Sequence, residues 1–155
     1  MKVSILGASG YVGGELLRLL LDHPEASVAQ VTSERLAGKL VTAAHPNLRG
    51  RTTLRFSRLG DLAPCDLLFA AMPHGSFAKT FAEVRAIAPR ILDMSADFRL
   101  RAPDAYRRWY GHDHENPAAL GEFVYGIPEL HREAIAGATC VTGAGCLATT
   151  AILGL

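Results

Sequence analysis

The chain has 155 residues, of which 49% are hydrophobic, and its 16 basic and 15 acidic residues give a formal net charge of +1. This length and apolar content allow one α/β domain with a substantial core, whereas two full domains require a longer chain. The balanced charge excludes the basic surface that nucleic-acid or anionic-membrane binding requires, so a small ligand is expected.

Short apolar strands alternate with helical patterns along the chain, which is typical of a mostly parallel sheet with crossover helices. The expected strands are residues 3–6, 27–32, 53–56, 66–71, 90–94 and 139–142. The expected helices are residues 11–22, 77–88, 103–110 and 147–155. The rest of segment 33–58 and the polar segment 111–121 are expected to be loops.

No apolar run approaches the roughly 20 residues that span a bilayer, and no targeting segment is visible at the start of the sequence. The three cysteines have neither CxxC spacing nor a partnering pair of histidines, so we expect no zinc or other metal site and no disulfide framework. These features predict a soluble, cytoplasmic protein with reduced thiols.

A glycine-rich run, Gly7-Ala8-Ser9-Gly10-Tyr11-Val12-Gly13, directly follows the first strand and opens the first helix. In this context GxxGxxG is a dinucleotide-binding fingerprint, because backbone N–H groups at the helix start hold a pyrophosphate. The run therefore predicts a Rossmann-type, doubly wound fold with helices on both faces of the sheet. The candidate cofactor-binding residues here are Gly7, Ser9, Gly10, Tyr11, Val12 and Gly13.

The choice of cofactor is normally made about 20 residues after the glycines, where an acidic side chain binds a ribose hydroxyl or a basic one binds a 2′-phosphate. Ser33 and Arg35 lie there, with Lys39 nearby, and they favour NADP. Glu34 lies between them and would favour NAD if it faced the ribose. Arg35 as a solvated loop charge is the structural alternative.

Ligand sites of open α/β sheets lie at the carboxyl ends of the strands, where three loops are rich in polar residues or glycine. His74, in the first, is a candidate contact for the cofactor or a substrate phosphate, or else a structural loop residue. Asp97 and Arg99, in the second, form either a loop-fixing ion pair or a substrate contact. Cys146 follows the third loop at a helix start, where the helix dipole stabilises a thiolate nucleophile. A packed, inert thiol is the alternative for Cys146.

The remaining candidates are assigned to the core. Cys65 precedes a strand and Cys140 lies within one, so both are interpreted as core residues. The aromatic residues Tyr106, Trp109 and Tyr110 share a short helix and are interpreted as packing residues.

Several longer motifs run in a fixed order over the whole chain. They are GASGYVGGELLRLL at 7–20, HPNLRG at 45–50, MPHG at 72–75, DMSADFRL at 93–100, YGIPEL at 125–130 and Gly145-Cys146 before a helix. In these motifs the chain resembles the N-acetyl-γ-glutamyl-phosphate reductases, including their relatives in lysine synthesis through a carrier protein. The sequence after Cys146, Leu147-Ala148-Thr149-Thr150, is similar to the lysine-branch or dual-use form.

This resemblance implies an NADP-dependent enzyme of arginine or lysine biosynthesis that reduces an acyl phosphate to a semialdehyde. Cys146 would be the catalytic residue and would form a thioester. The implied partner is the small-molecule acyl phosphate or its amino-group carrier protein, and full-length members are expected to be homo-oligomers, dimers or tetramers. The acid–base histidine of the family lies beyond the last residue of this sequence.

The resemblance also implies a domain division, with an NADP-binding Rossmann domain over residues 1–145 and the start of a truncated substrate domain over 146–155. On this basis the chain alone is expected to bind cofactor without turnover. A non-catalytic NADP-binding or carrier-binding module is the alternative function. A short-chain reductase is disfavoured because no Tyr-x-x-x-Lys pair follows the central strands.

Overall fold

A computed structural model describes residues 1–155 and divides the chain into two compact units. The first unit comprises Met1–Ala71 with Ala86–Pro89, and the second comprises Met72–Arg85 with Arg90–Leu155. Each unit is built around parallel strands.

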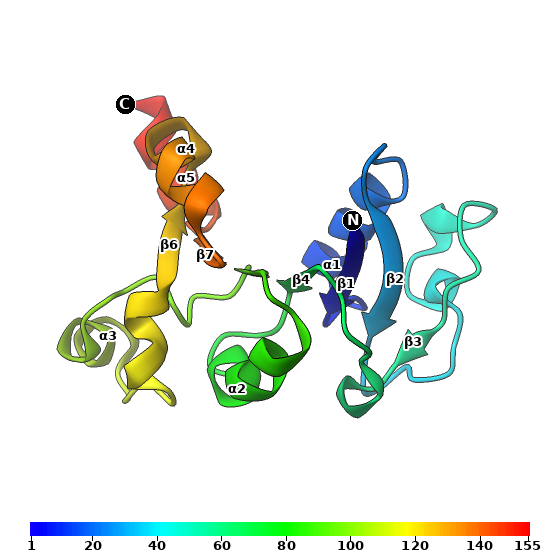
Figure 1. The fold of residues 1–155 in the computed structure, drawn as a ribbon, viewed down its shortest axis with the longest axis horizontal. Coiled ribbons are helices and arrows are strands. Elements are labelled where there is room, and N and C mark those ends of the chain that lie inside the picture. Colours follow the sequence, from blue (N-terminus) through cyan, green and yellow to red (C-terminus); the bar gives the residue numbers. More distant parts are fainter. The chain divides into compact units, whose positions relative to one another are not determined.

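The first unit contains four parallel strands in the order β3-β2-β1-β4 and one α-helix (Figure 1). Its elements are β1 (Lys2–Leu6), α1 (Tyr11–Leu20), β2 (Ser27–Thr32), β3 (Phe56–Ser57) and β4 (Leu67–Ala70). Four consecutive residues of β1, from Val3 to Leu6, are buried, as expected for a parallel strand covered on both faces. The glycine-rich turn therefore follows the end of an inner strand, β1, which lies between β2 and β4.

The segment between β2 and β3 was expected to be a loop, but it contributes to the core of the first unit. It forms two short 3₁₀ helices, η1 (Val41–Ala43) and η2 (Pro46–Leu48), and a third, η3 (Leu59–Asp61), follows β3. Leu36, Val41 and Leu48 are buried together with Leu17 of α1. Their burial fixes this segment against helix α1, beside the glycine-rich turn.

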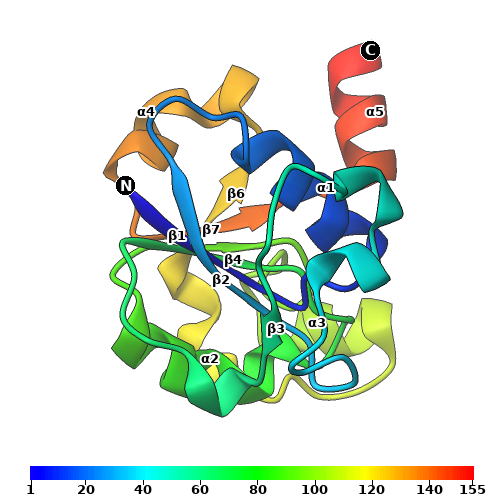
Figure 2. The same cartoon turned by 90° about the vertical axis from the view of Figure 1, so that its right-hand side faces the viewer.

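The second unit has three parallel strands in the order β5-β7-β6. These are β5 (Ile91–Asp93), β6 (Phe123–Gly126) and β7 (Cys140–Gly143). Its helical elements are α2 (Phe77–Ile87, whose last two residues are grouped with the first unit), α3 (Pro103–Tyr110), η4 (Pro117–Glu122), α4 (Pro128–Gly137) and α5 (Cys146–Gly154). Helix α5, the red helix that ends at the C-terminus in Figure 2, follows β7 in the chain, and none of its residues is buried.

An aromatic cluster forms the core of the second unit. The Phe98 and Phe123 rings stack with centroids 4.0 Å apart, and Phe81 packs at 5.2 Å from each of them. Tyr106 is buried and contacts His114 edge-on at 4.7 Å. Because Phe98 belongs to the loop after β5, this cluster holds that loop in place.

The structure confirms most of the expected elements and the Rossmann-type, mostly parallel α/β fold, but it corrects four details. Strand β6 and helix α4 were not anticipated, and the 3₁₀ helix η4 begins within a segment that was expected to be a loop. Trp109 was expected to pack, but its side chain is 71% exposed, because only Tyr106 of helix α3 faces the core. None of the helices is both long and apolar enough to cross a lipid bilayer.

Candidate functional site

The glycine-rich turn of the first unit connects β1 to α1 and brings backbone groups close together. Gly7 has a φ of 76°, a region that favours glycine, and its N–H donates to the Thr32 hydroxyl at 3.1 Å. A Cβ at Gly13 would lie 2.5 Å from the Ala8 Cα, so only glycine lets α1 approach the turn this closely. The N-cap Gly10 makes no side-chain cap, and the first turn of α1 carries no acidic residue. The N–H groups that open α1 thus remain available to an anion.

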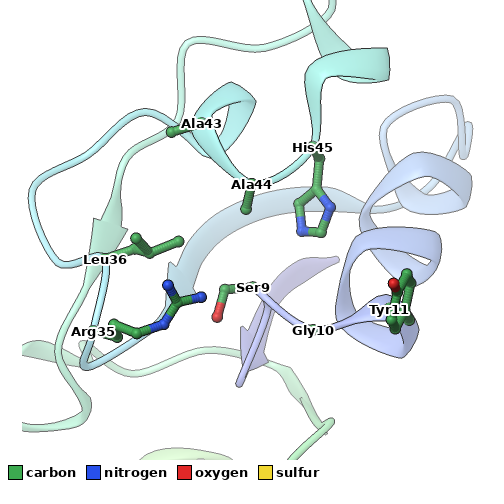
Figure 3. Close-up of a pocket in the computed structure, with 8 residues that line it drawn as sticks. All are labelled: Ser9, Gly10, Tyr11, Arg35, Leu36, Ala43, Ala44 and His45. Atoms are coloured by element: carbon green, nitrogen blue, oxygen red, sulfur yellow. The ribbon is translucent and has the colours of Figure 1, made fainter.

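A pocket of about 370 Å³ lies beside this turn, within the first unit (Figure 3). Its lining residues are Ser9, Gly10, Tyr11, Arg35, Leu36, Ala43, Ala44 and His45. In Figure 3 the Arg35 guanidinium extends toward Ser9, whereas the Tyr11 ring lies on the outer side of α1, away from Arg35. Three segments therefore form the walls: the glycine-rich turn, the turn after β2, and the end of η1.

The turn after β2 presents its serine, glutamate and arginine in different directions. The Ser33 hydroxyl bonds the Ser9 hydroxyl at 2.8 Å and also accepts the Leu36 N–H at 3.3 Å. The Glu34 carboxylate accepts the Leu59 N–H at 2.8 Å and is thereby held by the start of η3. Arg35 is exposed and pairs with no carboxylate. Of Ser33, Glu34 and Arg35, the side chain available to bind a ligand in the pocket is therefore the Arg35 guanidinium.

The second unit contains the other predicted loops, and Asp97 joins two of them. Its carboxylate accepts the Gly75 N–H at 2.6 Å and the Ala78 N–H at 2.9 Å. The expected Asp97–Arg99 ion pair is wrong, because both side chains are satisfied by backbone groups instead. Nδ1 of His74 accepts the Ala96 N–H at 2.8 Å, which leaves Nε2 as the protonated nitrogen of the neutral ring. His74 is thus a fixed, exposed N–H donor.

The turn before Cys146 is held by side chains from two other loops. Nε of Arg99 donates to the Gly143 carbonyl at 2.8 Å, and the Tyr125 hydroxyl donates to the Ala144 carbonyl at 3.3 Å. Gly145 has a φ of 90°, and Cys146 is exposed as the first residue of α5. Cys146 thus lies at the end of α5 where the first N–H groups have no acceptor within the helix.

A buried carboxyl group lies close to this turn. Asp93, at the end of β5, is fully buried and accepts hydrogen bonds from the Ser95 N–H and hydroxyl, each at 2.8 Å. Burial raises the pKa of Asp93 from its ordinary 3.8 to about 7, although the Ser95 hydrogen bonds and the Arg99 charge act in the opposite direction. This carboxyl therefore changes charge near neutral pH.

The other two cysteines differ from Cys146. Cys65 and Cys140 are buried, as the sequence predicts, and burial raises the pKa of the Cys140 thiol. No group of three or more His, Cys, Asp or Glu side chains is arranged to bind a metal ion.

The predicted site residues fall into both units. The first unit holds the glycine-rich turn with Ser33 and Arg35, and the second holds His74 and Cys146. Sequence reasoning assigned no role to His45, Tyr125 or Asp93, although each lies in one of the motifs HPNLRG, YGIPEL and DMSADFRL. Those motifs were the signal that could have identified them.

Comparison with known proteins identifies the family of this chain. Residues 2–138 match the family model of the semialdehyde dehydrogenase NAD-binding domain. The chain belongs to the semialdehyde dehydrogenase family. Because the matching model is that of an NAD-binding domain, the comparison supports a nicotinamide cofactor for this family.

Relatives of high identity carry the names of lysine-branch reductases. A Deinococcus radiodurans protein named LysW-L-2-aminoadipate 6-phosphate reductase is 52% identical over 153 residues, which are 99% of this chain and 44% of the relative. A Thermomicrobium roseum protein given that name provisionally is 55% identical over 155 residues, 100% of this chain and 44% of the relative. The chain thus spans less than half the length of these relatives, and the resemblance predicted from its motifs is confirmed.

Solved structures show the same fold at low identity. Aspartate semialdehyde dehydrogenase II of Vibrio cholerae superposes with a TM-score of 0.65 at 19% identity, over 99% of this chain and 44% of that one. The Candida albicans enzyme, solved with NADP, gives 0.53 at 16% identity, over 91% of this chain and 42% of that one.

Proposed function

We propose that the chain is the cofactor-binding and nucleophile-bearing part of an NADP-dependent acyl-phosphate reductase. The observation that carries this proposal is the exposed Cys146 at the start of α5, on a turn held by Arg99 and Tyr125. The Deinococcus and Thermomicrobium relatives, at 52% and 55% identity, carry names of phosphate reductases.

The chemistry follows from the position of the sulfur. The Cys146 thiolate attacks the acyl carbon, the bond from that carbon to the phosphate oxygen breaks, and inorganic phosphate leaves with the electron pair. The N–H groups that open α5 stabilise the oxyanion formed on the acyl oxygen. A bound nicotinamide cofactor supplies the hydride that reduces the thioester. The sulfur then leaves as a thiolate and releases the semialdehyde.

For the cofactor we propose NADPH, held by the turn that includes Gly7, Ser9, Gly10, Val12 and Gly13. Since Glu34 is engaged by the Leu59 N–H, the group facing the pocket after β2 is the Arg35 guanidinium, which suits a 2′-phosphate. Tyr11 lies at the rim of the pocket. The fixed Nε2–H of His74 is suited to donate to an oxygen of the cofactor or of the substrate phosphate.

The cofactor proposal is tested by measuring Kd for NADPH and NADH with wild type and Arg35→Ala. Wild type should bind NADPH more tightly, and Arg35→Ala should weaken NADPH binding by about tenfold while leaving NADH nearly unchanged, since a charge-assisted contact contributes about 1.5 kcal/mol or more. Arg49→Ala removes another exposed arginine of the same segment and serves as the control. Equal affinity for both cofactors, or an unchanged ratio in Arg35→Ala, contradicts the proposal.

For the substrate we propose the 6-phosphate of an aminoadipate whose amino group is carried on the LysW protein. This choice rests on the names of the Thermomicrobium and Deinococcus relatives. A Sulfurisphaera tokodaii relative at 43% identity is named for both this substrate and the LysW-glutamate phosphate, so a dual-use enzyme of lysine and arginine synthesis is the second candidate.

The nucleophile proposal is tested by the alkylation rate of Cys146 with iodoacetamide at neutral pH, followed by mass spectrometry. Exposure alone makes a thiol accessible, so the matched control is Thr150→Cys in a Cys146→Ser background, an exposed position one turn further along α5. Cys146 should react about tenfold faster than that control, because N–H donors at a helix start stabilise a thiolate. Equal rates would favour a non-catalytic NADP-binding or carrier-binding module.

A further inference from the structure

His45 connects two walls of the pocket in the first unit. It lies between η1 and η2, and its Nε2 is 2.8 Å from the Ala8 carbonyl oxygen, 37 residues away in the chain. A carbonyl oxygen only accepts, so Nε2 carries the proton and donates. Figure 3 shows the imidazole between Ala44 and α1, with one ring nitrogen directed toward the turn that carries Ser9.

Helix α1 leaves space for this ring at one position. A Cβ at Gly14 would lie 2.3 Å from Cε1 and 2.5 Å from Nδ1 of His45, so any side chain there would displace the imidazole. Gly14 is buried and lies inside a helix, where glycine costs about 1 kcal/mol relative to alanine. Glycine at this site is therefore explained by the ring that packs against it.

The pocket walls are joined by two side-chain hydrogen bonds. The Ser9–Ser33 bond connects the glycine-rich turn to the turn after β2. The His45–Ala8 bond connects the same turn to the segment that carries Ala43 and Ala44. Loss of the His45–Ala8 bond would release the segment with Ala43 and Ala44 from the glycine-rich turn. It would also leave the Ala8 carbonyl without this hydrogen bond.

We propose that His45 is a positioning residue for the dinucleotide: its imidazole, packed against Gly14, holds the Gly7–Gly13 turn and the η1–η2 wall in the geometry that binds the cofactor. This inference rests on the proposed function of the turn. The inference gives the HPNLRG motif a role in cofactor affinity through His45. This role is separate from those proposed for Arg35 and the glycines.

A purely structural role for His45 is the competing explanation, since the ring also contacts Phe56 edge-on at 6.5 Å. The chain offers a matched control for it. Arg51 ties the same segment to α1 through the Arg18 carbonyl and to the turn after α1 through the Asp22 carboxylate, but it is exposed and does not line the pocket. Replacing Arg51 should weaken the attachment of this segment near α1 but leave the position of the glycine-rich turn unchanged.

The experiment measures Kd for NADPH and the melting temperature of the 155-residue chain for wild type, His45→Leu, His45→Gln and Arg51→Met. His45→Leu should raise Kd about tenfold, the equivalent of about 1.4 kcal/mol for the lost hydrogen bond and the opened wall. His45→Gln places an amide N–H near the position of Nε2 and should restore most of the affinity. Arg51→Met should leave Kd unchanged.

A double-mutant cycle tests the packing against Gly14. Gly14→Ala should raise Kd in the wild-type background, but it should have little effect in a His45→Ala background, where no ring remains to displace. Gly60→Ala, at a glycine with open space around its Cβ position, is the control.

The outcomes separate this inference from the proposed function. If wild type binds neither NADPH nor NADH, both fail. If wild type binds NADPH and His45→Leu binds it equally well, or if Gly14→Ala has the same effect in both backgrounds, the positioning role alone is overturned. A lower melting temperature for His45→Leu with an unchanged Kd would assign His45 to stability only.

Discussion

Gly145 is constrained in two independent ways, and both concern the turn that leads to Cys146. Its φ of 90° is a conformation that other residues rarely adopt. A Cβ there would also lie 2.7 Å from Nη1 of Arg99, whose Nε holds the Gly143 carbonyl. A side chain at 145 would thus strain the backbone and displace the guanidinium that fixes the turn.

We expect Gly145→Ala to lower the free energy of unfolding by about 2 kcal/mol, from roughly 1 kcal/mol of backbone strain and roughly 1 kcal/mol for the weakened Arg99 hydrogen bond. Urea denaturation measures this difference. Gly121→Ala is the control, because that glycine has open space around it and lacks the left-handed conformation. A Gly145→Ala protein as stable as Gly121→Ala would show that neither constraint operates.

At the scale of elements, the strands and helices with strong local patterns could be predicted from the sequence. β2 and α3 have the expected bounds, and β1 and α2 differ by one residue at one end. Strand β6 was missed because its four residues, Phe-Val-Tyr-Gly, show no alternation, and Phe123 is placed by stacking on the distant Phe98. Helix α4 was missed as well, and it is kinked at His131.

In the candidate site, residues in local motifs could likewise be predicted from the sequence, whereas contacts between residues far apart in the chain could not. The glycine-rich turn and Cys146 could be proposed as candidates because each combines a local motif with a strand or helix boundary. Their supporting contacts were not, since His45 bonds a residue 37 positions away and Arg99 one 44 positions away. Local reasoning paired Asp97 with Arg99, two residues apart, whereas burial directs Asp97 to the N–H groups of Gly75 and Ala78.

For the whole molecule, one rule of parallel sheets explains where the candidate site residues and their neighbours lie in each unit. In the first unit the glycine-rich turn follows the carboxyl end of β1, and Ser33 follows that of β2. In the second unit Ser95 follows β5 and the turn to Cys146 follows β7. Parallel strands end at a common edge, so each unit gathers polar groups there while its apolar side chains remain in the core.

Asp93 makes the stability of the whole molecule depend on pH. Its pKa is about 7 in the folded chain and near 3.8 when the carboxyl is exposed to water, so the folded state binds the proton more tightly. The stabilisation from this carboxyl is complete below about pH 4 and is lost as the pH rises through about 7. Above that pH the folded chain holds a buried carboxylate that accepts hydrogen bonds from the Ser95 N–H and hydroxyl.

We therefore compare the free energy of unfolding of wild type with that of Asp93→Asn. As the pH rises from about 4 to about 7.5, the wild-type value should fall by up to about 4 kcal/mol relative to the variant, because one pKa unit corresponds to about 1.4 kcal/mol. Asparagine keeps the size of the side chain and cannot ionise, so its curve should lack this component. Urea denaturation at half-unit pH steps gives the difference between the two proteins, which removes the contribution of the histidines that both contain. Glu83→Gln, at an exposed position of α2, should follow wild type throughout. A wild-type curve parallel to that of Asp93→Asn across this range would show that the carboxyl ionises at its ordinary pH despite its burial.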